Sequence, residues 1–584
     1  MVTLMDDGHR YEKIGTRVLI IGAGAAGLRV AIELAENGVG CLVLGKRAHG
    51  DAHTIRAAGG INAALGTLDQ EDRWELHAAD TIREGRLVCD PRAVELLAKN
   101  APGRVRELAD WGCRFDRTRD GTINQRFFGA QTYRRACFVG DETGEEILDT
   151  LVRMAKSLNV PYRENLFVTK ILLDGSRAVG AAGYDMDRGV YAVFTARAVV
   201  LAAGGLTALY RRNSSRKDEN TGDAAALAYE AGAALRDMEF VQFHPTGMVR
   251  PQEMSGRLVT EAVRGEGGRL LNADGERYME RYSPRNLELD ARDVVARANY
   301  AEIQAGRGTE NGAVLLDISH KDPDHVKERL PGMHAQFKEH GVDITREPME
   351  VAPTAHYAMG GVAVEFDTGS TTLEGLFAVG EATAGTHGAN RLGGNSLAET
   401  LVFGKLTGAH LVGYARDAPA PSLHPAIVEE HLASLDRLSG AHGGHDPEDL
   451  CEELRKLLWD QAGIVRTGEG LEQGLRKLED LRSRAASLTA GARTSRRFEH
   501  AANLGFMLPV AEAVLRGGLL RGESRGAHHR EDFPETDEGW VRNVFYAKNA
   551  DGSMRLWTVP VGEIPRSIGA ELEKEQNRAY HHLE

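Results

Sequence analysis

Near the N-terminus, two short apolar runs enclose a glycine turn and a helical pattern. Residues 18–21 are continuously apolar, Gly22, Gly24 and Gly27 follow in a turn, and residues 28–37 carry apolar side chains at helical spacing. A second apolar run occupies residues 41–44. This order predicts a strand, a helix and a second strand, the unit that binds a nucleotide in Rossmann-like α/β folds.

Each glycine of this turn has a physical role in such a unit. Gly22 permits the tight turn, Gly24 lets the backbone approach a pyrophosphate, and Gly27 lets the helix pack closely on the strand. The free N–H groups at the start of the helix favour a phosphate. We therefore predict a phosphate site at this turn, whose other members are Ala23, Ala25 and Ala26.

Farther along the chain, strand patterns give way to helical ones. Residues 73–108 carry apolar positions at helical spacing, and residues 168–201 have the pattern of a meander of short strands. A proline-rich linker at residues 417–425 precedes amphipathic patterns at residues 454–488 and 498–515. These last patterns predict a bundle of helices.

Composition limits the class of protein. The chain has 584 residues, of which 42% are hydrophobic and 27% charged, and its formal net charge is -14. These values predict a soluble globular protein of several domains and give no support for nucleic-acid binding. No apolar run is long enough to span a bilayer, and residues 1–17 lack a signal-type apolar core.

The cysteines and histidines give no sign of a metal or disulfide framework. The five cysteines are scattered and form no CxxC pair, so we expect neither disulfides nor an iron–sulfur cluster within the chain. His528 and His529 are adjacent but lack further ligands at a recognisable spacing. We therefore predict no metal site.

The end of the second predicted strand departs from a nicotinamide site. An acidic residue commonly bonds the ribose there, whereas this chain has Lys46. Lys46 therefore argues against a plain NAD site and leaves another dinucleotide as the ligand.

The segment that follows is more specific. His53 and Thr54 precede Gly59, Gly60 and Ile61. This segment resembles the flavin-linking segment of the flavoprotein subunits of succinate dehydrogenase and fumarate reductase. In that family the histidine is bonded covalently to a methyl group of FAD. The resemblance therefore implies FAD that is bound covalently through His53.

Further blocks in the same order extend the resemblance over nearly the whole chain. They include residues 221–223, 238–247 and 386–397. The resemblance implies that Asp223 contacts FAD and that Glu381 bonds its polyol chain. It also implies that Ser396 and Leu397 lie against the flavin where a helix begins.

The resemblance implies an α/β fold, with a Rossmann-like FAD-binding domain, an inserted α+β capping domain and a C-terminal helical domain. We place the discontinuous FAD-binding domain at residues 11–245 and 353–415, the capping domain at 246–352, the helical domain at 426–530 and a small tail at 531–584. In the family the capping domain is mobile, and its closure could exclude water from the reacting atoms.

Four residues are candidates for binding the substrate, both by the resemblance and by their chemistry. A four-carbon dicarboxylate needs cations or hydrogen-bond donors at both ends. His244, Thr260, His356 and Arg391 supply them. Such a clamp would fix the reacting carbon against the flavin.

Two further residues are candidates for proton transfer. The resemblance implies that Arg292 exchanges a proton with the substrate and that Glu261 acts as a relay. A free guanidinium has a pKa above about 12 and seldom releases a proton. Burial beside other cations must therefore make the neutral form of Arg292 accessible.

These residues favour succinate dehydrogenase (succinate:quinone oxidoreductase), which oxidises succinate to fumarate by hydride transfer to FAD. Fumarate reductase, running in the reverse direction, stays open, because family members usually carry glutamine or glutamate where this chain has Ala58. L-aspartate oxidase resembles the family but lacks a counterpart of His53. A noncatalytic flavoprotein scaffold is an alternative of another class, against which the retained clamp residues argue.

The electrons left on the flavin need a second polypeptide. The dispersed cysteines offer no cluster, and no segment can reach a membrane quinone. The resemblance implies membrane anchor subunits and an iron–sulfur subunit, which would be the partners of this chain within a respiratory-chain complex of the tricarboxylic acid cycle. We therefore expect the chain to be peripheral to the cytoplasmic face of a bacterial cell membrane, held there through its partners.

Overall fold

A parallel sheet forms the centre of the computed structural model, which describes residues 3–4, 10–216, 218–440 and 444–575. Its five strands have the order β19-β12-β3-β4-β8. They are β3 (Val18–Ile21), β4 (Cys41–Leu44), β8 (Tyr162–Arg163), β12 (Ala198–Leu201) and β19 (Leu376–Ala378). Strands β3, β4 and β12 are buried along their whole length, as continuous apolar runs predict for a parallel sheet with both faces covered.

Helix α1 (Ala25–Glu36) connects β3 to β4 and packs against the long helix α11 (Asn395–Asp417). The predicted strand, helix and strand are thus confirmed. The helix begins at Ala25, before the predicted start at residue 28, because the glycine turn already leads into the first helical turn.

The predicted meander is confirmed as part of an antiparallel sheet with the order β1-β2-β11-β10-β9, in which only β2 and β11 run parallel. Its strands are β1 (Thr3–Leu4), β2 (Tyr11–Gly15), β9 (Leu166–Asp174), β10 (Arg177–Asp185) and β11 (Tyr191–Thr195). Helix α5 (Asp223–Ala231) packs against β9.

The predicted helical stretch at residues 73–108 consists of two helices, α2 (Trp74–Glu84) and α3 (Pro91–Asp110). Asp90 begins the second helix, because its side chain accepts hydrogen bonds from the backbone of Arg92 and Ala93 and Pro91 suits the first helical position. Helix α4 (Thr143–Ser157) and a small sheet complete this region. The small sheet contains β5 (Ile61–Asn62), β6 (Gln125–Arg126) and β7 (Ala136–Cys137).

The interval between the two parts of the FAD-binding fold has its own antiparallel sheet, in the order β14-β17-β16-β15. Its strands are β14 (Val241–Met248), β15 (Arg269–Leu271), β16 (Val314–Asp317) and β17 (Met349–Ala358). A separate hydrophobic cluster formed within residues 248–351 fills its core. Strands β14 and β17 cross the predicted limits of the capping domain, so both strands are shared between this unit and the FAD-binding region. The division into domains stays a prediction.

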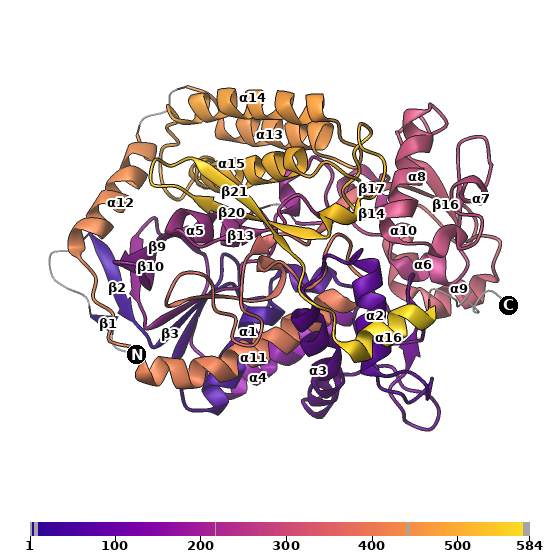
Figure 1. Cartoon of the computed structure of the whole chain (residues 1–584), viewed down its shortest axis with the longest axis horizontal. Coiled ribbons are helices and arrows are strands. Elements are labelled where there is room, and N and C mark those ends of the chain that lie inside the picture. Colours follow the sequence, from indigo (N-terminus) through magenta and orange to yellow (C-terminus); the bar gives the residue numbers. More distant parts are fainter. Residues whose placement is uncertain (1–2, 5–9, 217, 441–443, 576–584) are drawn as a thin grey trace.

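Short helices cover this sheet at one end of the molecule (Figure 1). They are α6 (Glu261–Gly265), α7 (Met279–Tyr282), α8 (Arg292–Gln304), α9 (Pro323–Arg329) and α10 (Pro331–Glu339). Helix α8 packs on both β14 and β17. Helix α8 is therefore held beside the two strands that cross between the units.

The predicted helical bundle is present as three helices packed on one another, α13 (Pro447–Gln461), α14 (Gly468–Ala485) and α15 (Arg496–Leu520), with α12 (Pro425–Leu438) beside β9 (Figure 1). Leucines at helical spacing, such as Leu450, Leu454 and Leu458, point into the shared core. No helix among the described residues is both long and apolar enough to cross a membrane.

The C-terminal tail is mixed α/β and packs on the rest of the chain. Strands β20 (Arg542–Lys548) and β21 (Met554–Pro560) form a hairpin, and β20 pairs with β13 (Leu235–Arg236). On its other side β13 pairs with β18 (Gly361–Val362). Helix α16 (Arg566–Glu575) packs on α2. The tail thus completes a sheet of the FAD-binding region, and residues 576–584 lie outside the described part.

Candidate active site

One cavity brings together nearly all residues that the sequence singled out. It lies at the carboxyl ends of β3, β4 and β12, between the starts of α1 and α11 and the strands β14 and β17. On the FAD-binding side it is lined by Gly22, Ala23, Gly24, Ala25, Ala26, Lys46, His53, Thr54, Gly59, Gly60, Asp223, Glu381, Ser396 and Leu397. The other side contributes His244, Thr260, Glu261, Arg292, His356 and Arg391.

Gly27 is the predicted residue that does not line the cavity. A Cβ atom at Gly27 would lie 2.1 Å from the carbonyl oxygen of Gly22, so Gly27 allows the helix to pack on the turn behind the cavity. Gly22 has φ +117, and a Cβ there would meet the carbonyl oxygen of Ala202 at 2.1 Å. The glycines therefore serve close packing and the turn, as predicted.

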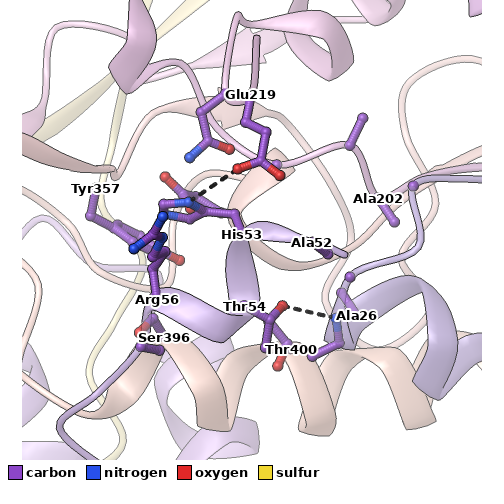
Figure 2. Close-up of a pocket in the computed structure, with 18 of the residues that line it drawn as sticks. Ala26, Ala52, His53, Thr54, Arg56, Ala202, Glu219, Tyr357, Ser396 and Thr400 are labelled. Atoms are coloured by element: carbon purple, nitrogen blue, oxygen red, sulfur yellow. Dashed lines mark hydrogen bonds and ion pairs between the residues drawn. The ribbon is translucent and has the colours of Figure 1, made fainter. Parts of the chain in front are cut away.

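The N-terminus of α1 is open toward the cavity. Its N-cap is Gly24, which has no side chain to cap the helix, and its first turn contains no acidic residue. Thr54 Oγ1 accepts a hydrogen bond from the Ala25 N–H at 3.1 Å (Figure 2). Unsatisfied N–H groups at the positive end of a helix attract a phosphate.

At another part of the cavity Lys46 pairs with Asp223. Lys46 Nζ lies 2.8 Å from Asp223 Oδ2 and donates to Asn503 Oδ1 at 3.0 Å. The same ammonium group lies 3.9 Å from the centre of the Phe167 ring. Asn503 comes from α15, far away in the sequence, and no local pattern pointed to it.

The linking segment forms a short 3-10 helix, η1 (His53–Arg56), beside the cavity. His53 Nδ1 lies 3.8 Å from Glu219 Oε2 (Figure 2). Burial raises the pKa of Glu219, but His53 and Arg216 outweigh it and lower the pKa to about 2. The sequence did not point to Glu219, because only the fold brings it close to His53.

Two histidines of the predicted clamp face each other across the strands that bound the cavity. The rings of His244 and His356 are 5.4 Å apart between centroids. Burial, followed by nearby arginines, holds both pKa values well below the ordinary value, so both rings are neutral near pH 7. His244 Nδ1 accepts the Thr246 N–H at 3.2 Å, which leaves the proton of the neutral ring on Nε2 as a donor.

Arg391 is the cation of the predicted clamp, and it is deeply buried. Its residue is 2% exposed, and its Nε has no hydrogen-bond partner among the described residues. Nη1 donates to Ser396 Oγ at 3.2 Å, and the guanidinium lies 4.5 Å from the centre of the Tyr357 ring. Burial, aided by Arg292, lowers the pKa of Arg391 to about 10. Such a cation calls for an anionic ligand.

Arg292, the first residue of α8, forms a two-donor contact with Glu261, the first residue of α6. Arg292 Nε and Nη2 donate to Glu261 Oε2 at 2.9 and 2.7 Å. Arg264 Nη2 lies 3.7 Å from the same oxygen. Burial raises the pKa of Glu261, but Arg292 and Arg264 prevail and lower it to about 2. Glu261 is therefore an ionised group between two arginines. The sequence did not point to Arg264 as a residue of the site.

Comparison with known proteins gives the family. The pattern described as an FAD binding domain matches residues 17–397, and that described as the fumarate reductase flavoprotein C-term matches residues 451–568. One subunit of the fumarate reductase (CoM/CoB) of Methanothermobacter marburgensis is 44% identical over 90% of this chain and 96% of its own length. The chain belongs to the succinate dehydrogenase and fumarate reductase flavoprotein family.

Members with either name resemble the chain along almost its whole length. The succinate dehydrogenase flavoprotein subunit of Rickettsia bellii is 36% identical over 95% of both chains. The solved quinol fumarate reductase of E. coli has a TM-score of 0.89 at 33% identity, covering 95% of this chain and 99% of that one. The predicted α/β fold is confirmed, and the protein is an FAD-dependent oxidoreductase.

The cavity fits the FAD that membership of this family implies. The open end of α1 suits the pyrophosphate, and Gly22 and Gly24, which have no side chains, line the cavity beside it. Glu381 is partly buried, and loss of solvent around its carboxyl group raises its pKa. Its Oε1 accepts the Ala358 N–H at 3.1 Å. A carboxyl group in this position can bond hydroxyl groups, as the polyol chain of FAD provides.

A buried chain of amides leads from Arg292 away from the cavity. Arg292 Nη1 donates to Gln242 Oε1 at 3.2 Å, and Gln242 Nε2 donates to Asn390 Oδ1 at 2.7 Å. Asn390 Nδ2 donates to Glu84 Oε1 at 2.7 Å and to Asp293 Oδ1 at 2.9 Å. These amides hold Arg292 from the side opposite Glu261, and they come from separate segments of the chain.

Glu84 makes this network sensitive to pH. Burial raises the pKa of Glu84 to about 8, although Arg86 opposes the shift. A carboxyl group with a raised pKa in the folded state loses its contribution to stability as pH rises from its unfolded value toward about 8. We therefore expect Glu84→Gln, which keeps an acceptor for Asn390, to raise the melting temperature relative to wild type increasingly between pH 5 and pH 8.

Thermal unfolding of both proteins at several pH values tests this expectation. The exposed substitution Glu36→Gln serves as a control for the loss of one carboxyl group. A difference between Glu84→Gln and wild type that stays constant from pH 5 to pH 8 would contradict the raised pKa.

Proposed function

We propose that this chain is the flavoprotein subunit of a succinate dehydrogenase, which oxidises succinate to fumarate. The observation that carries the proposal is the pair of buried guanidinium groups, Arg292 and Arg391, in one cavity with two neutral histidines. The carboxylate that lines the cavity beside them, Glu261, is already paired with Arg292. A dicarboxylate supplies the missing negative charge and suits planar bidentate donors.

The residues would hold the substrate at both ends. Arg391 is a bidentate partner for one carboxylate, because its donors in the cavity are not fully used. His244 Nε2–H and the hydroxyl group of Thr260 are neutral donors for the other end. Holding both ends leaves the central carbons with little freedom, which is a large part of what an active site contributes. FAD, when bound, supplies the acceptor for a hydride.

The proton that leaves the substrate as the hydride is transferred would be taken by Arg292. Its nearest acceptor is Glu261, which also lines a second cavity of about 560 Å³ on the side away from the clamp. Arg264 lies on the far side of Glu261. The second cavity would give Glu261 access to solvent.

The covalent attachment of FAD through His53 is part of the proposal. We expect wild-type protein to keep its flavin after denaturation, and His53→Ala to bind FAD only noncovalently, because alanine has no nucleophile. Flavin fluorescence of a denaturing gel and flavin in the acid-soluble fraction measure both forms. Recovery of all wild-type flavin in the acid-soluble fraction would exclude the covalent bond.

We further propose that membrane anchor subunits and an iron–sulfur subunit are the partners of this chain, at the cytoplasmic face of a bacterial cell membrane. The relatives from Methanothermobacter marburgensis and Rickettsia bellii are named as subunits, and the E. coli structure is a quinol fumarate reductase. These names support an assembly of several chains. The five cysteines of the chain are separate and buried, so they are poorly placed to carry electrons onward. Affinity purification from mild detergent should recover a cysteine-rich partner and small hydrophobic subunits.

Fumarate reduction is the second candidate. The relative from Methanothermobacter marburgensis is named a fumarate reductase (CoM/CoB), at a higher identity than the succinate dehydrogenase subunit of Rickettsia bellii. In addition, Ala58 lines the cavity where the family usually carries a polar residue near the flavin. The loss of that polar neighbour alters the surroundings that set the potential of the flavin.

Turnover of the purified native complex tests these proposals together. Succinate with an artificial electron acceptor, and fumarate with a reduced dye, give the two directions under one set of conditions. A rate in either direction excludes a noncatalytic scaffold, and the larger rate assigns the direction. Turnover of L-aspartate instead of succinate would replace the proposal by L-aspartate oxidase.

A further inference from the structure

The carboxylate of Glu219 faces the imidazole of His53 from the loop that precedes α5. Both residues line the cavity, and Figure 2 shows the contact between Glu219 Oε2 and His53 Nδ1 at 3.8 Å. Nδ1 is buried and has no hydrogen-bond partner among the described residues. The distance exceeds that of a hydrogen bond, so the ring of His53 would have to turn toward Glu219 to close it.

Arginines fix the position and charge of this carboxylate. Arg216 Nε donates to Glu219 Oε2 at 2.8 Å, and Arg216 Nη2 donates to Oε1 at 2.5 Å. Arg47 Nε lies 3.4 Å from Oε1. The side chain of Glu219 is 11% exposed. Glu219 is therefore an ionised group that is held in place beside His53.

We propose that Glu219 is a positioning residue that keeps the proton of neutral His53 on Nδ1 and leaves Nε2 as the nucleophilic nitrogen. The hydrogen bond at one ring nitrogen decides which nitrogen of a neutral histidine carries the proton. An aspartate beside Nδ1 fixes the imidazole of hydrolytic triads in the same way. The inference deepens the proposed covalent attachment of FAD and rests on it.

The attachment step shows why a carboxylate is useful at this place. His53 Nε2 forms a bond to the methyl carbon of FAD, and one C–H bond of that methyl group breaks. The electron pair of the broken bond remains on the flavin ring, which also takes up the proton and ends reduced by two electrons. The imidazole then carries a positive charge, with its Nδ1–H facing Glu219. A fixed carboxylate stabilises that charge as it develops.

Glu219 could also act only by neutralising Arg216 and Arg47. A variant of Asp51 distinguishes this structural role from the positioning of His53. Asp51 also pairs with Arg216, and its Oδ2 lies 3.7 Å from Arg47 Nη1. Asp51 thus neutralises the same two arginines as Glu219 does. Asp51→Asn removes a charge from this cluster as Glu219→Gln does, but it leaves the carboxylate beside His53.

The test measures the reactivity of His53 directly. Full-length chain produced in riboflavin-starved cells is treated with diethyl pyrocarbonate, and carbethoxylation of the His53 peptide is followed by mass spectrometry. In Glu219→Gln the rate at His53 should fall by about tenfold, as expected when a hydrogen bond to a charged group is lost. Asp51→Asn should react at the wild-type rate. Added FAD then gives the rate of covalent attachment, which should fall in parallel in Glu219→Gln.

An unchanged carbethoxylation rate in Glu219→Gln would overturn the inference, and so would an equal decrease in Asp51→Asn. If Glu219→Gln slows carbethoxylation while wild-type protein releases all its flavin in acid, the positioning role stands and the covalent attachment fails. The two proposals are therefore separable.

Discussion

Arg391→Ala is expected to weaken the binding of succinate and of the inhibitor malonate by about 2–5 kcal/mol, the range found when one partner of a buried charge pair is removed. Arg391 is 2% exposed and lines the cavity together with Arg292, His244 and His356, so its removal leaves one carboxylate of the ligand without its buried partner. Calorimetric titration of the FAD-loaded protein with malonate gives the binding free energy without turnover.

A matched variant separates charge from geometry at this position. Arg391→Lys keeps one positive charge but loses the planar fork that a carboxylate accepts. We expect its malonate affinity to lie between those of wild type and Arg391→Ala. The FAD content of both variants reports whether the cavity is intact, because Ser396, the partner of Arg391, also lines it. Unchanged malonate affinity in Arg391→Ala, with normal FAD content, would remove Arg391 from the substrate site.

The local part of the site could be predicted because its signals are short. The glycine turn and the apolar strand before it lie next to each other in the sequence, and glycine is required where a Cβ at Gly22 or Gly27 would collide with backbone. The segment from His53 is likewise continuous. Such features are specified by neighbouring residues, so one pass along the chain finds them.

The contacts that support these residues could not be predicted in the same way. Asn503 reaches Lys46 from α15, and Asn390 bridges Gln242 and Glu84 from separate elements. Polar residues of these types occur throughout the chain, and only the fold brings these together. Glu219 is the clearest example, because it follows no recognisable pattern and still lies beside His53.

The pairing of the tail with the FAD-binding region could not be predicted for a similar reason. Strand β13 consists of Leu235 and Arg236 alone, which is too short to give a period in the sequence. It nevertheless lies between β18 and β20, and in this way it joins the tail to the FAD-binding region. A long hairpin is visible as a pattern, whereas the short strand that receives it is not.

Arg292→Ala is expected to lower the turnover number by about 10²–10⁴-fold, the range that a positioned acid or base contributes. Its two donors to Glu261 and the amide of Gln242 hold the guanidinium from both sides, so its place in the cavity is fixed before substrate binds. A guanidinium that is fixed in this way can exchange a proton with one defined atom of the substrate. Steady-state rates of the assembled enzyme in both directions measure the effect.

The alternative role for Arg292 is that of a second carboxylate anchor, and the kinetic constants distinguish the two. Removal of an anchor that binds substrate and transition state equally raises KM and leaves kcat unchanged. Removal of the group that transfers the proton lowers kcat. Glu261→Gln supplies the complementary test, since glutamine keeps an acceptor for Arg292 but carries no proton to solvent. If Arg292 transfers the proton, Glu261→Gln also lowers kcat, while malonate affinity stays near wild type. The opposite result is a rise in KM alone in Arg292→Ala together with a wild-type kcat in Glu261→Gln. It would assign both residues to substrate binding and show that neither transfers the proton.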